Sequence, residues 1–137
     1  MFKSSEVGNE ILCVMHGIDS SLLRNNKELH KILEQAVRKE NFQIMKRAEH
    51  ALIPHGYTLA FILAESHAVL STYPEFSSLT FHLSTCRGKD SGKLVLEYLK
   101  EKLKPKDVHF ISHAVPFSYK EFLKIKKAKK SENDKWD

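Results

Sequence analysis

The sequence contains few cysteines and no long run of apolar residues. Only two of the 137 residues are cysteines, Cys13 and Cys86, and their spacing fits neither a metal site nor a disulfide framework. No apolar run approaches the roughly 20 residues that a membrane-crossing helix needs. The first residues also lack the charged-then-apolar order of a secretion signal. We therefore expect no membrane partner and a location in the reducing cytoplasm.

Histidine and lysine are plentiful, but their positions favour neither a metal site nor a nucleic-acid surface. No pair among the eight histidines has a zinc-binding spacing on a predicted helix, and no cysteine cluster joins them. The formal net charge is +5, and more than half of this excess lies in residues 120–135. A basic run at a chain end is more often a solvated terminus, and elsewhere no basic stripe alternates with aromatic residues. We expect neither a metal ion nor a nucleic-acid partner.

The order of apolar patterns predicts eight elements of secondary structure. Short apolar or alternating runs indicate strands, and apolar residues at helical spacing indicate helices. Asn25 or Asn26 can cap the first helix, and Asp90 or Ser91 the second, which has Leu94 on its apolar face. The predicted elements are a strand at residues 10–16, a helix at 22–42, strands at 42–51, 57–64, 67–70 and 79–85, a helix at 93–103 and a strand at 108–111.

These elements predict an α/β fold of the α+β kind. Strands outnumber helices and each helix has one apolar face, so both helices can pack on one face of a mainly antiparallel sheet. The expected architecture is a two-layer sandwich. At 137 residues the chain can form a single core, and dimerisation would add stability. The basic end can continue as a helix from Tyr119.

A polar break at the end of a buried strand is the most informative feature. The apolar residues 59–64 are followed at once by Glu65, Ser66 and His67, whose burial costs free energy unless each finds a partner. A serine hydroxyl can attack the preceding carbonyl and form an ester, whose elimination and hydrolysis leave a pyruvoyl group. Such a ketone forms a Schiff base with a substrate amine and serves as the electron sink of a decarboxylation. A Glu-Ser pair alone is more often a capping serine at a strand end.

A thiol and two imidazoles are candidates for proton transfer. Cys86 could protonate the carbanion left after loss of carbon dioxide, although an isolated cysteine is more often a small buried apolar residue. His67 follows the serine, and His82 lies on the strand that leads to Cys86. These two are the histidines best placed for acid–base work, and either could also be a surface or hydrogen-bonded core histidine.

Four short motifs then occur in a fixed order along the chain. They are His50 with Pro54-His55-Gly56, Ala-Glu-Ser-His at residues 64–67, Thr-Tyr-Pro-Glu at residues 72–75, and Thr85-Cys86. Together they resemble the S-adenosylmethionine decarboxylase family in its short prokaryotic form, over most of residues 8–116. The resemblance implies a pyruvoyl-dependent decarboxylase of polyamine biosynthesis, with S-adenosylmethionine as substrate, that cleaves itself between Glu65 and Ser66.

The same resemblance implies roles for individual residues. Ser66 becomes the pyruvoyl group, Cys86 donates the proton in catalysis, Thr58 assists processing, and Glu75 lies on the substrate side. The family fold is a two-layer sandwich that dimerises, so a homodimer of processed chains is expected. Residues 1–116 then form the decarboxylase-like domain, and residues 117–137 form a basic tail.

Some positions depart from the family pattern. Ser71 stands where the family has the histidine that acts as base in the elimination, so another histidine would have to serve, with His67 and His82 as candidates. His82 itself replaces an acidic residue. Leu52 stands where an aromatic ring stacks on adenine, and it has no ring face to offer.

These departures leave two alternatives beside the family default. Some family members have shifted to L-ornithine or L-arginine, and such a substrate needs an acid for its cationic tail, with Glu75 or Glu65 as candidates. Such a substrate has no adenine ring to be stacked on an aromatic side chain, which agrees with the leucine at position 52. Alternatively, the serine at position 71 suggests an unprocessed paralogue that binds and regulates an active partner.

Overall fold

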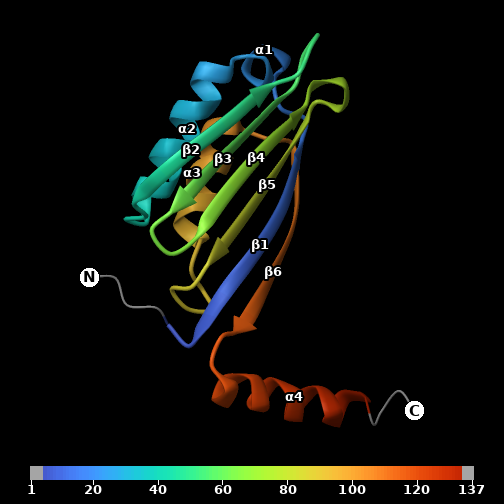
Figure 1. The fold of residues 1–137 in the computed structure, drawn as a ribbon. Helices are drawn as coiled ribbons and strands as arrows, with labels where there is room; N and C mark the ends of the chain where they lie inside the picture. The colour runs from blue at the N-terminus through green and yellow to red at the C-terminus, as the bar shows by residue number, and fades with distance from the viewer. Residues whose placement is uncertain (1–4, 134–137) are drawn as a thin grey trace.

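A six-stranded antiparallel sheet forms one layer of the protein (Figure 1). The computed structural model describes residues 5–133; residues 1–4 and 134–137, which include the start of the chain and the end of the basic tail, lie outside the described residues. The sheet has the strand order β2-β3-β4-β5-β1-β6. Its strands are β1 (Val7–His16), β2 (Ile44–Ala51), β3 (Tyr57–Leu63), β4 (His67–Tyr73), β5 (Ser78–Thr85) and β6 (Asp107–Pro116).

Helices form the second layer, on one face of the sheet. The helices α1 (Ser20–Leu23), α2 (Asn26–Lys39) and α3 (Lys93–Leu103) lie on the same side in Figure 1. The core contains Leu29 and Leu33 of α2, Leu99 of α3, and the sheet residues Phe61 and Phe81, all fully buried. Their burial is the main stabilising contribution to the packing of the two layers. The predicted two-layer α+β sandwich is confirmed.

The residues expected as the first helix form two helices instead. Asp19 caps α1, accepting the Ser21 N–H at 2.8 Å. Asn25 then caps α2, because its side-chain oxygen accepts the Glu28 N–H at 3.1 Å. The helix expected within residues 22–42, with Asn25 as one of its two candidate caps, is confirmed as α2, whereas Leu22 and Leu23 belong to the separate helix α1.

The N-terminus of α3 is capped by Glu40, the residue that directly follows α2. Neither expected cap, Asp90 or Ser91, fills this position, which belongs to Gly92. The carboxylate of Glu40 instead accepts three backbone N–H groups at the start of α3, at 2.9, 2.7 and 3.0 Å. A carboxylate at a helix N-terminus complements the helix dipole. Glu40 thereby joins the end of α2 to the start of α3.

Two other details differ from the prediction. Leu94 is 53% exposed, and Leu96 occupies the core of α3 in its place. The last strand runs over ten residues, Asp107–Pro116, where only residues 108–111 were expected. Most of the side chains of β6 are exposed, so its sequence lacks the apolar signal of a buried strand.

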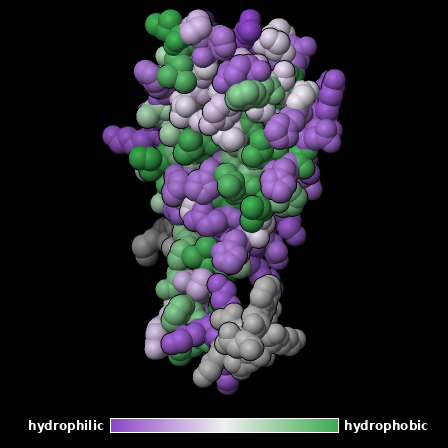
Figure 2. Space-filling model, turned by 90° about the vertical axis from the view of Figure 1, so that its right-hand side faces the viewer, coloured by the Kyte–Doolittle hydropathy of each residue, from purple (hydrophilic) through white to green (hydrophobic). Residues whose placement is uncertain are grey.

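The face of the sheet opposite α2 and α3 is not covered by these helices. We call it the open face; it carries the strand residues that alternate with the core, among them Leu12, Ile62, Tyr73 and Ile111, which are 50%, 57%, 40% and 54% exposed. The register places Leu12 of β1 between His82 of β5 and Ile111 of β6. Figure 2, the view from the right-hand side of Figure 1, shows green apolar patches among purple polar residues.

The last helix, α4 (Tyr119–Asn133), points away from the sandwich (Figure 1). The expected helix from Tyr119 is confirmed, and Tyr119, Phe122 and Leu123 on it are exposed. Within residues 5–133, none of the helices combines the length and the apolar character that a membrane crossing requires. The division into a domain at residues 1–116 and a tail at residues 117–137 stays a prediction.

Candidate functional site

The Glu65-Ser66 bond lies in the tight turn between β3 and β4. The Leu63 N–H donates to the Ser66 carbonyl oxygen at 2.8 Å, and the Ser66 N–H donates to the Leu63 carbonyl oxygen at 3.5 Å. Ala64 and Glu65 are thus the two loop residues of a β-hairpin. The Ala64 N–H also donates to the Gln43 carbonyl oxygen at 3.0 Å. The polar break in the sequence is therefore a tight turn. Main-chain hydrogen bonds close this turn and also attach it to Gln43.

The Ser66 hydroxyl is buried in this turn. It has no hydrogen-bond partner among the described residues. Leaving a buried hydroxyl unpaired costs about 1–3 kcal/mol, and such groups are rare in folded proteins. This cost is explained if the hydroxyl must be available to react with the neighbouring Glu65 carbonyl.

Cys86 contacts the Glu65 carbonyl directly. Its thiol donates a hydrogen bond to the Glu65 carbonyl oxygen, with a sulfur–oxygen distance of 2.9 Å. The structure thus brings together Glu65, Ser66 and Cys86, although Cys86 belongs to the segment that follows β5. The other cysteine, Cys13, is fully buried in β1, where burial raises the pKa of its thiol to about 11.

Arg87, which the sequence analysis does not single out, holds the Glu65 side chain. Its Nε atom lies 2.6 Å from Glu65 Oε1, and the Glu65 side chain is 2% exposed. Neither carboxylate oxygen of Glu65 accepts an aligned hydrogen bond from a described residue. The ion pair with Arg87 therefore offsets the burial of this carboxylate. The only signal in the sequence is the position of Arg87 directly after Cys86.

His67 and His82 lie together on the open face, close to the turn. Their ring centroids are 5.7 Å apart, in an edge-to-face arrangement. His82 Nε2 lies 2.9 Å from Glu10 Oε2, and the Ser84 hydroxyl donates to Glu10 Oε1 at 2.7 Å. The sequence analysis misses Glu10, because only the register of β1 against β5 brings it beside these residues.

Thr58 and Ser71 pair with each other and not with Ser66. Their hydroxyl oxygens are 3.2 Å apart, and the two residues are direct partners in the β3–β4 ladder. Ser71 lies five residues beyond Ser66 along an extended strand, a span of roughly 16 Å at about 3.3 Å per residue. Within one chain, neither hydroxyl of this pair can reach the Ser66 end of β4.

Two of the three expected substrate-side residues, Leu52 and Glu75, lie at the opposite end of β3 and β4 from the turn that contains Glu65. Leu52 is in the β2–β3 connection and is 51% exposed, and its N–H donates to the Gly56 carbonyl oxygen at 2.9 Å. Glu75 is in the short helix η1 (Pro74–Phe76), where its Oε2 lies 3.9 Å from His55 Nε2. A cavity of about 280 Å³ adjoins the β2–β3 connection. One chain therefore does not bring Leu52 or Glu75 to Ser66.

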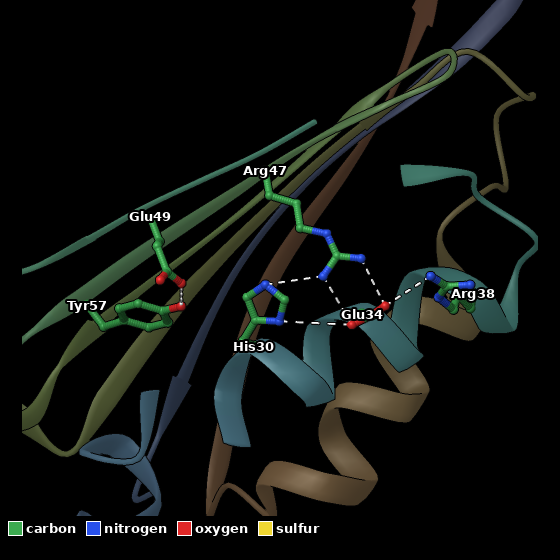
Figure 3. A network of polar contacts seen from close by, with 6 residues as sticks. All are labelled: His30, Glu34, Arg38, Arg47, Glu49 and Tyr57. Atoms are coloured by element: carbon green, nitrogen blue, oxygen red, sulfur yellow. Dashed lines mark hydrogen bonds and ion pairs between the residues drawn. The ribbon is translucent and has the colours of Figure 1, made fainter. Parts of the chain in front are cut away.

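A separate polar network lies on the helix-covered side, between α2 and β2 (Figure 3). Glu34 accepts hydrogen bonds from Arg38 and from Arg47, each at 2.9 Å, and the hydrogen bond from Arg47 lowers the pKa of Glu34. The Tyr57 hydroxyl donates to Glu49, and burial raises the pKa of Tyr57. A cavity of about 490 Å³ lies beside this network. The network shares no residue with the Glu65-Ser66 turn.

The residues at the turn fit a pyruvoyl group made from the chain itself. Such a group requires a serine with an available hydroxyl and a donor at the preceding carbonyl, which are the unpaired Ser66 hydroxyl and the Cys86 thiol. Among residues 5–133, no three His, Cys, Asp or Glu side chains are grouped so that they could hold a metal ion.

The sequence matches one family of known proteins. The family model described as S-adenosylmethionine decarboxylase matches residues 9–114. The chain is 31% identical over 102 residues to the S-adenosylmethionine decarboxylase proenzyme of Sulfurihydrogenibium sp. (strain YO3AOP1), covering 74% of this chain and 77% of that protein. It is also 31% identical over 103 residues to the proenzyme of Pyrobaculum islandicum, covering 74% and 82%.

Solved structures show the same fold. The crystal structure of the adenosylmethionine decarboxylase from Aquifex aeolicus VF5 superposes with a TM-score of 0.73 and 25% identity, covering 80% of this chain and 91% of that chain. The Trypanosoma brucei AdoMetDC-delta26 monomer gives a TM-score of 0.56 at 12% identity, covering 76% of this chain and 45% of that one. The second likeness concerns the fold alone.

Proposed function

Since this chain belongs to the S-adenosylmethionine decarboxylase family, which consists of pyruvoyl-dependent decarboxylases, we propose that it generates its pyruvoyl group from Ser66 by self-cleavage. The observation that carries this proposal is the unpaired, buried Ser66 hydroxyl next to a Glu65 carbonyl that accepts the Cys86 thiol. The pyruvoyl group supplies an electron sink for decarboxylation of a substrate amine. Proton transfer and substrate binding are carried out by side chains of the protein.

The cleavage proceeds through an ester. Ser66 Oγ attacks the Glu65 carbonyl carbon while Cys86 donates to the oxygen that gains negative charge. The carbon–nitrogen bond then breaks, its nitrogen takes the proton that Ser66 Oγ gave up, and an ester joins Glu65 to Ser66. A base removes the Ser66 Cα proton, and the bond between Ser66 Cβ and Oγ breaks, so that Oγ leaves as part of the Glu65 carboxylate and a double bond forms between Cα and Cβ. Water hydrolyses the remaining dehydroalanine to a pyruvoyl group and ammonia.

We infer that the His67–His82 pair supplies the base that Ser71 cannot provide. The two rings are in contact, and Glu10 lies 2.9 Å from His82. A carboxylate at this distance can hold the imidazole in a fixed orientation for proton transfer. Replacing His82 with asparagine should slow the elimination and let the ester accumulate, which hydroxylamine would reveal by cutting the chain at Ser66. Unchanged cleavage in both His67→Asn and His82→Asn would exclude the pair.

S-adenosylmethionine is the proposed substrate, because the related proenzymes are named for it. A basic amino acid, L-ornithine or L-arginine, is the second candidate. Two observations favour it: Leu52 offers no ring for adenine, and Glu10 places a carboxylate on the open face where a cationic tail could bind. Release of labelled carbon dioxide from each of the three substrates would decide, and no release from any of them would refute the enzyme proposal.

An unprocessed regulatory paralogue is the alternative from another class, favoured by the hydroxyl of Ser71 in place of a base. Denaturing mass measurement of the purified protein separates the two proposals. Two fragments with a junction before Ser66 support the decarboxylase. A single chain of 15.8 kDa would support the paralogue.

We also propose that the open face pairs with a second copy of the chain. Exposed apolar residues lie on this face, including Leu12 of β1 and Ile111 of the edge strand β6. A two-fold axis that places the two open faces together with their strands reversed would bring the partner's Thr58 and the partner's Ser71 toward the Ser66 end, which one chain cannot do by itself. Leu12→Arg should convert the dimer to a monomer in sedimentation analysis and slow self-cleavage. A wild-type protein that is monomeric yet fully cleaved would refute this pairing.

A further inference from the structure

We propose that Arg87 is a positioning residue for the self-cleavage, holding Glu65 so that its carbonyl stays within reach of the Ser66 hydroxyl. This inference rests on the proposed cleavage between Glu65 and Ser66. Arg87 does not contact the bond that breaks. It acts through the side chain of Glu65, whose carbonyl is attacked.

The guanidinium of Arg87 is itself fixed at several points. Nη1 donates to the Glu40 carbonyl oxygen at 2.5 Å, and Nη2 donates to the Asn41 carbonyl oxygen at 2.8 Å. The guanidinium also lies over the Phe42 ring, 4.1 Å from its centroid. The end of α2 therefore orients the planar group, because a cation is favourable at carbonyls that lack helical partners. The Nε atom that remains points to Glu65.

Two adjacent residues then hold Glu65 at two different atoms. The Cys86 thiol lies 2.9 Å from the carbonyl oxygen of Glu65, and Arg87 Nε lies 2.6 Å from its carboxylate. A residue held by both its main chain and its side chain has little freedom to rotate the peptide plane. Displacing a reacting group by about 1 Å can cost on the order of 100-fold in rate. Loss of the second contact is therefore expected to slow the attack itself.

The burial of Glu65 shows why this contact is needed. The Glu65 side chain is 2% exposed, although a loop glutamate would ordinarily extend into water. A buried carboxylate without a paired charge is costly, so without Arg87 the side chain would turn outward. Such a movement would carry the Glu65 peptide with it, because Glu65 is one of only two residues in the hairpin loop.

The experiment compares cleavage rates of full-length chains made by cell-free synthesis and sampled over time on denaturing gels. Arg87→Gln should cleave about tenfold more slowly than the wild type. Arg87→Lys keeps a positive charge near Glu65, so its cleavage rate should lie between those of the wild type and Arg87→Gln. The matched control is Arg47→Gln, because Arg47 likewise pairs with a glutamate, Glu34, at 2.9 Å (Figure 3). Its guanidinium also lies over a phenylalanine ring, that of Phe61.

Two readouts separate positioning from a general loss of stability. Hydroxylamine cuts the chain only where the ester has formed, so Arg87→Gln should also reduce hydroxylamine-induced cleavage. Glu65→Gln should slow cleavage as well, and Arg87→Gln combined with Glu65→Gln should be no slower than the slower single variant, since both remove the same contact. If Arg87→Gln does not fold, Arg87→Lys and Glu65→Gln are compared in the same way.

The possible outcomes are distinct. Slow cleavage in Arg87→Gln with a normal rate in Arg47→Gln, together with the non-additive double variant, supports the proposal. Cleavage of Arg87→Gln within twofold of the wild type overturns it while leaving the proposed function intact. Equal slowing in Arg47→Gln, or additive effects of the two changes, also overturns it. A wild-type chain that never cleaves refutes the proposed function and this inference with it.

Discussion

The contact between the Cys86 thiol and the Glu65 carbonyl predicts that Cys86 serves in self-cleavage as well as in turnover. The thiol lies 2.9 Å from the oxygen that becomes negatively charged when Ser66 attacks. Replacing Cys86 with alanine removes this donor and leaves the remaining turn unchanged. Replacing it with serine keeps a donor on a side chain of nearly the same size.

The size of the effect follows from the kind of donor. Removing one donor from a preformed oxyanion site typically costs about 2.7–4 kcal/mol. A thiol is a weak donor, so about half of this value, roughly 1.5–2 kcal/mol, is expected here. This corresponds to a cleavage rate that is about tenfold to thirtyfold lower in Cys86→Ala. Cys86→Ser should cleave at close to the wild-type rate.

Turnover should respond differently. If Cys86 also protonates the carbanion after decarboxylation, both variants should release product far more slowly than the wild type once they are fully cleaved, because a serine hydroxyl is a much weaker acid. Cleavage is measured by sampling cell-free synthesis over time, and turnover by release of labelled carbon dioxide. Cleavage of Cys86→Ala at the wild-type rate would refute the role of the carbonyl contact. Wild-type turnover in cleaved Cys86→Ser would refute the proton-donor role.

Three further outcomes are expected. Glu40→Ala removes the acceptor of three N–H groups at the start of α3, so it should lower the free energy of unfolding by about 2 kcal/mol and Tm by roughly 7 °C; an unchanged thermal unfolding curve would contradict this. Glu34→Gln should lower the free energy of unfolding at pH 7 by about 1 kcal/mol at most, and Tm slightly with it. Arg47 lowers the pKa of folded Glu34, so the stabilisation is complete above the unfolded-state pKa, near about 4.3, and disappears as the pH falls through the lower folded-state pKa; a difference in Tm that grows toward pH 3 would show that the sign is wrong. Iodoacetamide at pH 8 should add one group to the native chain, at Cys86, because Cys13 is fully buried with a pKa of about 11; rapid modification of Cys13 in the peptide map would show that β1 opens.

The sequence predicted the layers of the fold because the apolar pattern reports burial. The strand at Tyr57–Leu63 and the helix at Lys93–Leu103 were recognisable from their own residues. The cap of α3 was not, because Glu40 lies 52 residues before the first N–H group that it accepts. β6 was predicted too short because a strand with mostly exposed side chains has little apolar periodicity.

The site could be predicted only in part for a similar reason. The unusual polarity of residues 65–67 marks the turn, and the resemblance links Ser66 to Cys86. Glu10 and Arg87 were missed because their contacts depend on strand register and on the approach of α2 to the turn. A one-residue change of register would place Glu10 on the other face of the sheet. A single sequence does not state that register.

The strand order has a consequence for the two pieces that a cut before Ser66 would produce. The first piece would carry β1, β2 and β3, and the second would carry β4, β5 and β6. Because β1 lies between β5 and β6, and β3 lies beside β4, three separate ladders would join the pieces. Strands of both fragments would thus be hydrogen-bonded to one another within a single sheet. In the Leu12→Arg background, which removes the proposed dimer, unfolding of the cut protein would then become a dissociation of the two pieces, so its midpoint should rise with protein concentration, whereas that of the uncut Ser66→Ala chain should not.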